Sequence, residues 1–237
     1  MDKDSINVTF ADTIMERPYP FTVGHRQFYL YPVTLGKMFL LQRLMDTLQV
    51  NQENMSLDTN LEVLRLVREH RETCCEVLSY HTAKNDYESV TSYRNFVKRR
   101  NIFMKECTDS DLFTLMVIVL TSDKTQEFIK ELGLDKEQDR KSMVMKVKDD
   151  KNNISFGGKS LIGSFIAPLM EIGFTKQEIV YERSYSFLRL MLMDKISSVY
   201  VSDEELKKLP RSVVEPPSVI KADDPNNKDI IKSMDWS

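Results

Sequence analysis

The sequence contains few glycines, cysteines and histidines, and these shortages limit the kinds of site it can build. Its 237 residues include 7 glycines, 3 cysteines and 3 histidines, and no glycine follows Gly173. So few glycines argue against a glycine-rich loop that cradles phosphate, and they fit a helix-rich chain. Cys74 and Cys75 are adjacent, and a disulfide between neighbours is strained. With Cys107 the count is odd, so we expect reduced thiols and an intracellular protein.

The sequence also lacks a large net charge and any long apolar run. The formal net charge is −3 with 29% charged residues, which gives no reason to expect nucleic acid or an anionic membrane as a partner. No apolar run approaches the roughly 20 residues that span a bilayer. Residues 1–10 lack the basic and apolar regions of a signal peptide. We therefore expect a cytoplasmic protein whose partners include neither a membrane nor nucleic acid.

Helical periodicity dominates the chain, and one strand-like stretch precedes it. Residues 21–31 place β-forming residues on both sides of Gly24-His25, which predicts a hairpin. To be stable, this hairpin must lie against the helices or pair elsewhere. Thr34 can then cap a helix over about 35–50. Further helices are expected over about 58–81, 87–106, 109–120 and 124–133, with a polar loop at 51–56. Residues 134–153 could form a charged helix, a loop or a short strand.

The stretch 155–199 predicts two helices with a tight joint. Gly173 can end the first helix in the left-handed conformation, and Thr175 with Glu178 can form a capping box for the second. From Phe187 to Met193 the second helix is apolar nearly all round, so it must be covered on several sides. It is either the central helix of its domain or a helix with one face reserved for a partner.

These patterns predict a mainly α fold with a small β-hairpin and an extended tail. The expected parts are an N-terminal segment with the hairpin at 1–33, a helical domain at 34–201, and a flexible, charged and proline-rich tail at 202–237. The single tryptophan, Trp236, stands in that tail. It either anchors a partner or folds back onto its own domain.

No arrangement of reactive side chains indicates an enzyme. His70, Cys74 and His81 could share a helix face, but zinc needs about four ligands, and no spacing supplies a second close pair. No G-x-S-x-G or H-E-x-x-H motif is present. The run 157–160 precedes a helix and could hold an anion, although a plain loop-to-helix junction explains it better. We predict no catalytic, metal-binding or cofactor-binding residue.

The helix expected around 92–101 leaves one alternative open. It carries Tyr93 and Phe96 among arginines, a mixture that suits stacking and phosphate contacts with single-stranded nucleic acid. An amphipathic helix with solvated cations is the favoured interpretation, and it buries Tyr93, Phe96, Val97 and Phe103.

Two segments carry a resemblance to a known family. Residues 21–45 read FTVGHRQFYLYPVTLGKMFLLQRLM, a hairpin followed by an aromatic-Pro-x-Thr-Leu-Gly start of a helix. Residues 166–192 read IAPLMEIGFTKQEIVYERSYSFLRLML, a helix, a Gly-Phe-Thr joint and a second helix. Together they resemble the tail assembly chaperones of long-tailed bacteriophages, in which an N-terminal strand unit precedes a helical domain with a similar joint. Residues 51–153 carry no such likeness.

The resemblance implies a non-enzymatic chaperone of virion assembly in the host cell cytoplasm. Such chaperones coat the long, apolar tape measure protein and help tail-tube subunits to assemble around it, and 13 methionines suit a surface that repacks around apolar partners. Two alternative functions stay open: a structural baseplate or connector subunit, and an enzyme with scattered site residues. Self-association also stays possible. The expected partner-binding residues are Leu35, Phe39, Tyr181, Tyr185, Leu188, Leu192 and Trp236.

Overall fold

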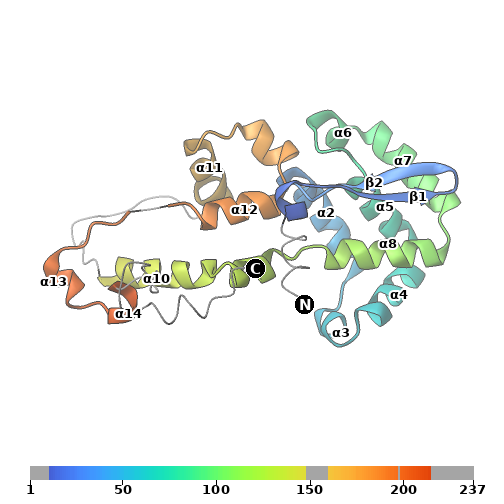
Figure 1. Cartoon of the computed structure of the whole chain (residues 1–237). Helices are drawn as coiled ribbons and strands as arrows, with labels where there is room; N and C mark the ends of the chain where they lie inside the picture. The colour runs from blue at the N-terminus through green and yellow to red at the C-terminus, as the bar shows by residue number, and fades with distance from the viewer. Residues whose placement is uncertain (1–10, 148–159, 197, 215–237) are drawn as a thin grey trace, which may run out of the picture. The chain divides into compact units, whose positions relative to one another are not determined.

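The structure, a computed structural model, describes residues 11–147, 160–196 and 198–214, and this part of the chain is mainly helical (Figure 1). The predicted class, mainly α with a small β-hairpin, is confirmed. The chain divides into two units, one of Met1–Leu132 with Gly157–Lys195 and one of Gly133–Phe156 with Ile196–Ser237. The hairpin thus belongs to the same unit as most helices, whereas the predicted boundary at residue 33 separated them.

The hairpin consists of β1 (Tyr19–Val23) and β2 (Arg26–Leu30), paired antiparallel with Phe21 opposite Phe28. Gly24 makes the turn with φ 58°, a conformation that glycine adopts without strain. The ring of Phe28 lies 4.9 Å from that of Phe103 in α7 (Tyr93–Glu106). The hairpin therefore lies against the helices beside α5 and α7, as expected (Figure 1).

The hairpin shares one large core with five helices, and we name this core the main cluster. The helices are α2 (Leu35–Leu48), α4 (Thr59–Glu69), α5 (Arg71–His81), α7 and α8 (Asp109–Thr121). Helix α4 packs on α8, and α5 packs on α2 and α7. The buried members are Val23, Leu30, Leu41, Leu48, Val63, Leu66, Val67, Cys74, Cys75, Val77, Leu78, Phe103, Cys107, Leu112, Leu115, Met116 and Val119.

All three cysteines are free and belong to the main cluster. Burial raises the pKa of Cys74 to about 11, and the pKa values of Cys75 and Cys107 to about 12. Because the thiolate is the reactive form, these side chains act as small apolar core residues.

A second, smaller core forms where the 155–199 stretch meets the start of α2, and we name it the small cluster. It is built by η1 (Ile162–Ile166), α11 (Ala167–Glu171), η2 (Glu178–Glu182) and α12 (Tyr185–Met193), and η1 and η2 are π-helical. The predicted joint is confirmed, since Gly173 has φ 106° and the backbone N–H of Glu178 donates to the Thr175 hydroxyl at 3.2 Å. The buried members are Leu35, Phe165, Leu169, Ile179 and Leu188.

Three helices expected to be continuous are interrupted. The 58–81 helix breaks at His70 (φ −130°), so that α4 and α5 can pack on different neighbours. The 87–106 helix divides into α6 (Tyr87–Thr91) and α7 at Ser92, whose hydroxyl caps α7. The last helix breaks between η2 and α12, where Ser184 caps α12, and it ends at Met193.

The predicted loop at 51–56 is wrong, because these residues form α3 (Gln52–Leu57). The side chain of Asn51 caps this helix by accepting from two backbone N–H groups of its first turn. The buried Glu62 carboxylate accepts from the Asn51 N–H at 2.9 Å and from Arg65 at 2.6 Å. Hydrogen bonds from Arg65 and Asn51 lower the pKa of Glu62 to about 2, so the carboxylate stays ionised and joins α3 to α4.

Helix α9 (Thr125–Glu131) and a helical turn at residues 11–14 also belong to the first unit. The second unit contains α10 (Leu134–Val147), α13 (Asp203–Leu206) and α14 (Arg211–Val214). The guanidinium of Arg140 donates to the Val213 carbonyl at 2.7 Å and ties α10 to α14. For residues 134–147 the helical alternative is thus confirmed, whereas α13 and α14 replace the first part of the predicted tail. Trp236 lies outside the described residues.

Candidate functional site

A cavity of about 370 Å³ lies in the first unit, where residues 12–19, the end of β2, α8 and α12 meet. We name it the junction pocket. Most of its wall is apolar, and its lining residues Tyr19 and Met38 are also exposed on the surface, by 52% and 36%. The lining residues are Asp12, Thr13, Arg17, Tyr19, Leu30, Tyr31, Pro32, Val33, Met38, His81, Ile118, Val119, Ser122, Asp123, Ser184, Tyr185 and Ser186.

Backbone contacts between distant segments hold two walls of the pocket together. The N–H of Tyr185 donates to the Val33 carbonyl at 2.8 Å, and Thr34 forms an antiparallel bridge with Ser184. Both Thr34 and Ser184 are N-caps, of α2 and α12 respectively. The starts of the two helices are therefore fixed against each other beside the cavity.

The N-terminal wall is fixed by Glu16, a non-glycine residue with φ 51°. Its carboxylate accepts from the backbone N–H of Ser184 and pairs with Arg183 at 3.3 Å. A carboxylate is favoured there, because Ser184 begins helix α12 and the start of a helix carries partial positive charge. On the same segment Arg17 pairs with Asp12 at 3.1 Å.

His81 is the buried titratable group of the lining. Burial and the nearby Lys37 lower its pKa to about 3, so the imidazole is neutral at physiological pH. Among the described residues no hydrogen bond joins its ring to Ser184, Ser186 or Asp123. A nucleophile paired with a base, which covalent catalysis needs, is therefore not formed by these side chains.

Lys37 lies behind the pocket wall and is fully buried. Its ammonium donates to the Ala83 carbonyl at 2.5 Å and lies 5.4 Å from the centre of the Tyr31 ring. Burial, with a smaller repulsion from Arg99, lowers the pKa of Lys37 to about 7. The burial of Lys37 could not be predicted from the sequence, because one lysine on an amphipathic helix gives no local sign that it points inward.

Two of the expected partner-binding residues are core residues. Leu35 and Leu188 are 1% and 0% exposed and belong to the small cluster, so in the folded chain neither reaches a partner. Leu192 is half-buried and packs against the same cluster. The apolar face that suggested a docking helix is thus covered largely by the chain itself.

The other described candidates are more accessible. Tyr185 is half-buried, lines the junction pocket and stacks on Phe165 at 5.2 Å between ring centres. Tyr181 meets Tyr87 edge-on at 5.1 Å. Phe39 is 55% exposed on α2. The structure therefore brings one of the predicted residues, Tyr185, into the pocket and leaves Phe39 on the surface.

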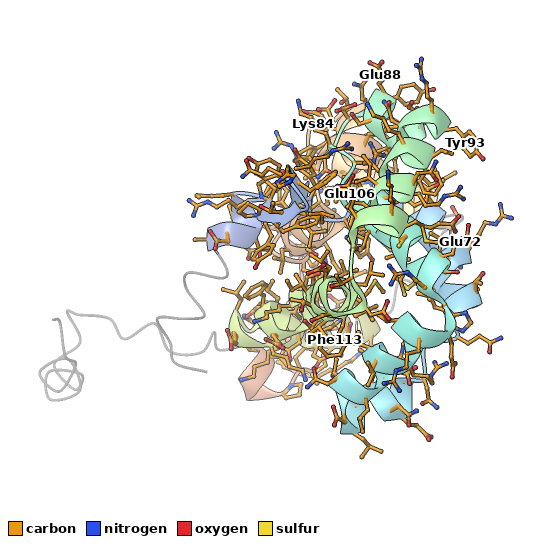
Figure 2. All side chains as sticks on the ribbon, turned by 90° about the vertical axis from the view of Figure 1, so that its right-hand side faces the viewer. Glu72, Lys84, Glu88, Tyr93, Glu106 and Phe113 are labelled. Carbon is orange, nitrogen blue, oxygen red and sulfur yellow. The ribbon has the colours of Figure 1, made fainter. Side chains whose placement is uncertain are left out.

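The basic helix α7 uses part of its charge within the chain. Arg99 donates to the Ser79 carbonyl at 2.9 Å, and Arg100 pairs with Glu76 at 3.3 Å. Phe96 is buried as expected, but the expected burial of Tyr93 is wrong, since its side chain projects into solvent (Figure 2). With these arginines engaged, the helix offers fewer cations to a nucleic acid than its sequence indicates.

The described residues contain no group of three or more His, Cys, Asp or Glu side chains placed to hold a metal ion. Within the same residues, no helix is both long and apolar enough to cross a bilayer. No family model, no curated protein and no solved structure matches the chain.

Proposed function

We propose that the chain is a non-enzymatic protein that binds an apolar helical segment of a partner in the junction pocket. The observation that carries the proposal is the pocket itself, an apolar cavity that the described residues leave open and whose lining includes the exposed Tyr19 and Met38. Amphipathic helices bind in this way, by inserting large apolar side chains into a groove. The flexible thioether of Met38 can adapt to different side chains.

We further propose, from the resemblance, that the chain is a phage tail assembly chaperone whose partner is the tape measure protein. Both resembling segments contribute to the pocket wall: residues 30–33 and Met38 come from 21–45, and residues 184–186 come from 166–192. A tape measure protein repeats apolar residues along a long helix and offers many such side chains. On this proposal the chain works in the host cytoplasm, and the tail-tube protein is its second partner.

Co-expression with a tape measure protein tests the proposal. The full chain should raise the soluble yield of the tape measure protein, and the double variant Tyr19→Ser/Met38→Gln should lower the co-purified amount about tenfold, since each lost anchor costs about 1 kcal/mol or more. Leu57→Gln/Leu61→Gln is the matched control, because these two exposed leucines of α3 and α4 lie outside the lining.

Two results would contradict the proposal. If the pocket variant co-purifies as much tape measure protein as the wild-type chain does, the pocket is not the binding site. If the wild-type chain does not raise the soluble yield of the tape measure protein, the chain is not its chaperone. Thermal melting of each variant shows whether the fold is intact.

A further inference from the structure

In the part of the chain that the structure describes, one carboxylate at the junction pocket keeps an oxygen without a partner. The Oδ1 atom of Asp123 accepts from the backbone N–H of Thr125 at 3.0 Å and from its hydroxyl at 2.5 Å, and the Ser186 hydroxyl lies at 3.5 Å. Among the described residues no hydrogen bond or ion pair reaches Oδ2. Because Asp123 is exposed, this oxygen is available to a group that approaches from outside.

The remaining charges of the lining do not neutralise Asp123. Asp12 and Arg17 pair with each other at 3.1 Å, and His81 is neutral at physiological pH because its pKa is about 3. Lys124, the next residue in the chain, is not part of the lining. Among the described residues of the lining, Asp123 is therefore the carboxylate that no opposite charge pairs with, and it stands beside mostly apolar walls.

We propose that the junction pocket selects a partner segment in which a large apolar side chain is accompanied by a lysine or arginine that pairs with Asp123. This inference rests on the proposed binding function and specifies the chemistry of the bound segment. The apolar stem of a lysine or arginine can cover the pocket rim while its charged head reaches the carboxylate. An acidic segment would bring like charges together, and the pocket would reject it.

The aromatic residues of the lining favour the same occupant. Tyr19 and Tyr185 both line the pocket, and the face of a tyrosine ring attracts a cation. Tyr31 contributes less, since the Lys37 ammonium already lies 5.4 Å from its ring centre. A basic group beside the apolar anchor thus meets a carboxylate and tyrosine side chains in one place.

Two labelled amphipathic helical peptides with the same leucine-rich face test the inference. One carries lysines beside the leucines and the other carries glutamates, and binding to the full chain is measured by fluorescence anisotropy. The lysine peptide should bind about threefold to fivefold more tightly at low salt, as expected for an exposed ion pair. The preference should fade at about 1 M salt, where charges are screened beyond about 3 Å.

Asp123→Asn should remove most of the preference and leave only the small part that the tyrosine rings contribute, since asparagine keeps an Oδ1 acceptor for Thr125 and removes the charge. Asp46→Asn is the matched control, because Asp46 is an exposed carboxylate of α2 outside the lining, and it should leave the preference unchanged. Tyr19→Ser/Met38→Gln should weaken the binding of both peptides, because both lose the contacts of the two apolar side chains.

Equal affinities on the wild-type chain, or a preference of unchanged size in Asp123→Asn, would overturn the inference. If neither peptide binds while the tape measure protein is still solubilised, the pocket inference fails and the chaperone function stands. If the lysine peptide binds selectively but the tape measure protein is not solubilised, the chaperone function fails and the binding site stands.

Discussion

The two clusters of the first unit are made from different kinds of helix. The main cluster uses helices of 11 to 14 residues, and several of them begin at a side-chain cap. The small cluster uses segments of 5 to 9 residues, two of them π-helical. Short helices are marginal by themselves, so the small cluster depends on Leu35, which α2 contributes from the main body. The junction pocket lies next to the small cluster, since Tyr185 lines the pocket and packs against that cluster.

The main cluster should be the rigid part of the first unit, and the small cluster should be the part that opens. Regions with few buried apolar contacts open at lower free energy than the rest of a protein, and binding sites are often drawn from them. The small cluster has five buried members and the main cluster has seventeen. We therefore expect η2 and α12 to open before α5 and α8.

The largest effect is expected from Phe103→Ala in the main cluster. Phe103 is fully buried, and replacing a buried phenylalanine by alanine costs about 3–5 kcal/mol of unfolding free energy. Leu188→Ala is the counterpart in the small cluster and should cost about 2 kcal/mol, because its half-buried neighbours can move into the space. Urea unfolding of both variants gives the two values. A cost for Leu188→Ala equal to that for Phe103→Ala would show that the small cluster is as rigid as the main one.

A smaller effect is expected from Gly36→Ala, where α2 meets η2. A Cβ atom there would lie 2.9 Å from the Val180 carbonyl oxygen and 3.1 Å from the Tyr181 ring. The backbone must therefore move, at a cost of about 1–3 kcal/mol. Amide hydrogen exchange should accelerate in η2 and α12 and stay unchanged in α5 and α8. Gln42→Ala, at an exposed position of the same helix, is the control, and equal exchange in both variants would contradict the prediction.

The smallest effect is expected from Lys37→Met, which should change how the unfolding free energy depends on pH. The pKa of Lys37 falls from 10.5 to about 7 on folding, so between these values the unfolded chain binds more protons. The unfolding free energy should therefore rise with pH in this window, by about 1 kcal/mol between pH 7 and pH 8. Lys37→Met should remove that rise, whereas Lys98→Met, at an exposed position of α7, should keep it. If the unfolding free energy of Lys37→Met still rises with pH as in the wild-type chain, the rise comes from another group.

The features that could be predicted from the sequence are those fixed by neighbouring residues. Gly24 in the hairpin turn, the Thr34 cap and the capping box of Thr175 with Glu178 each depend on residues within a few positions. The interruptions at His70 and Ser184 could not be predicted, because they follow from packing between distant segments. Arg71, for example, donates to the Cys107 carbonyl at 2.6 Å, which holds the start of α5 against the end of α7.

The candidate site was predicted only in part for a related reason. The periodicity of 181–192 correctly indicated an apolar helical face, but periodicity does not say whether that face meets the chain itself or a partner. Leu188 therefore proved to be a core residue, and Tyr185 reached the pocket. The pocket has walls from segments as distant as residues 12 and 186, and no local pattern joins them.

The hydrogen bond from Ser184 to Glu16 spans 168 positions, and this separation sets an order of events during synthesis. The ribosome makes the chain from its N-terminus, so the Glu16 carboxylate emerges long before its partner does. Until residue 184 has left the exit tunnel, the Glu16 carboxylate cannot accept the hydrogen bond from Ser184 that fixes the N-terminal wall of the pocket. A nascent chain thus completes the junction pocket late, after most of the main cluster's sequence is already outside.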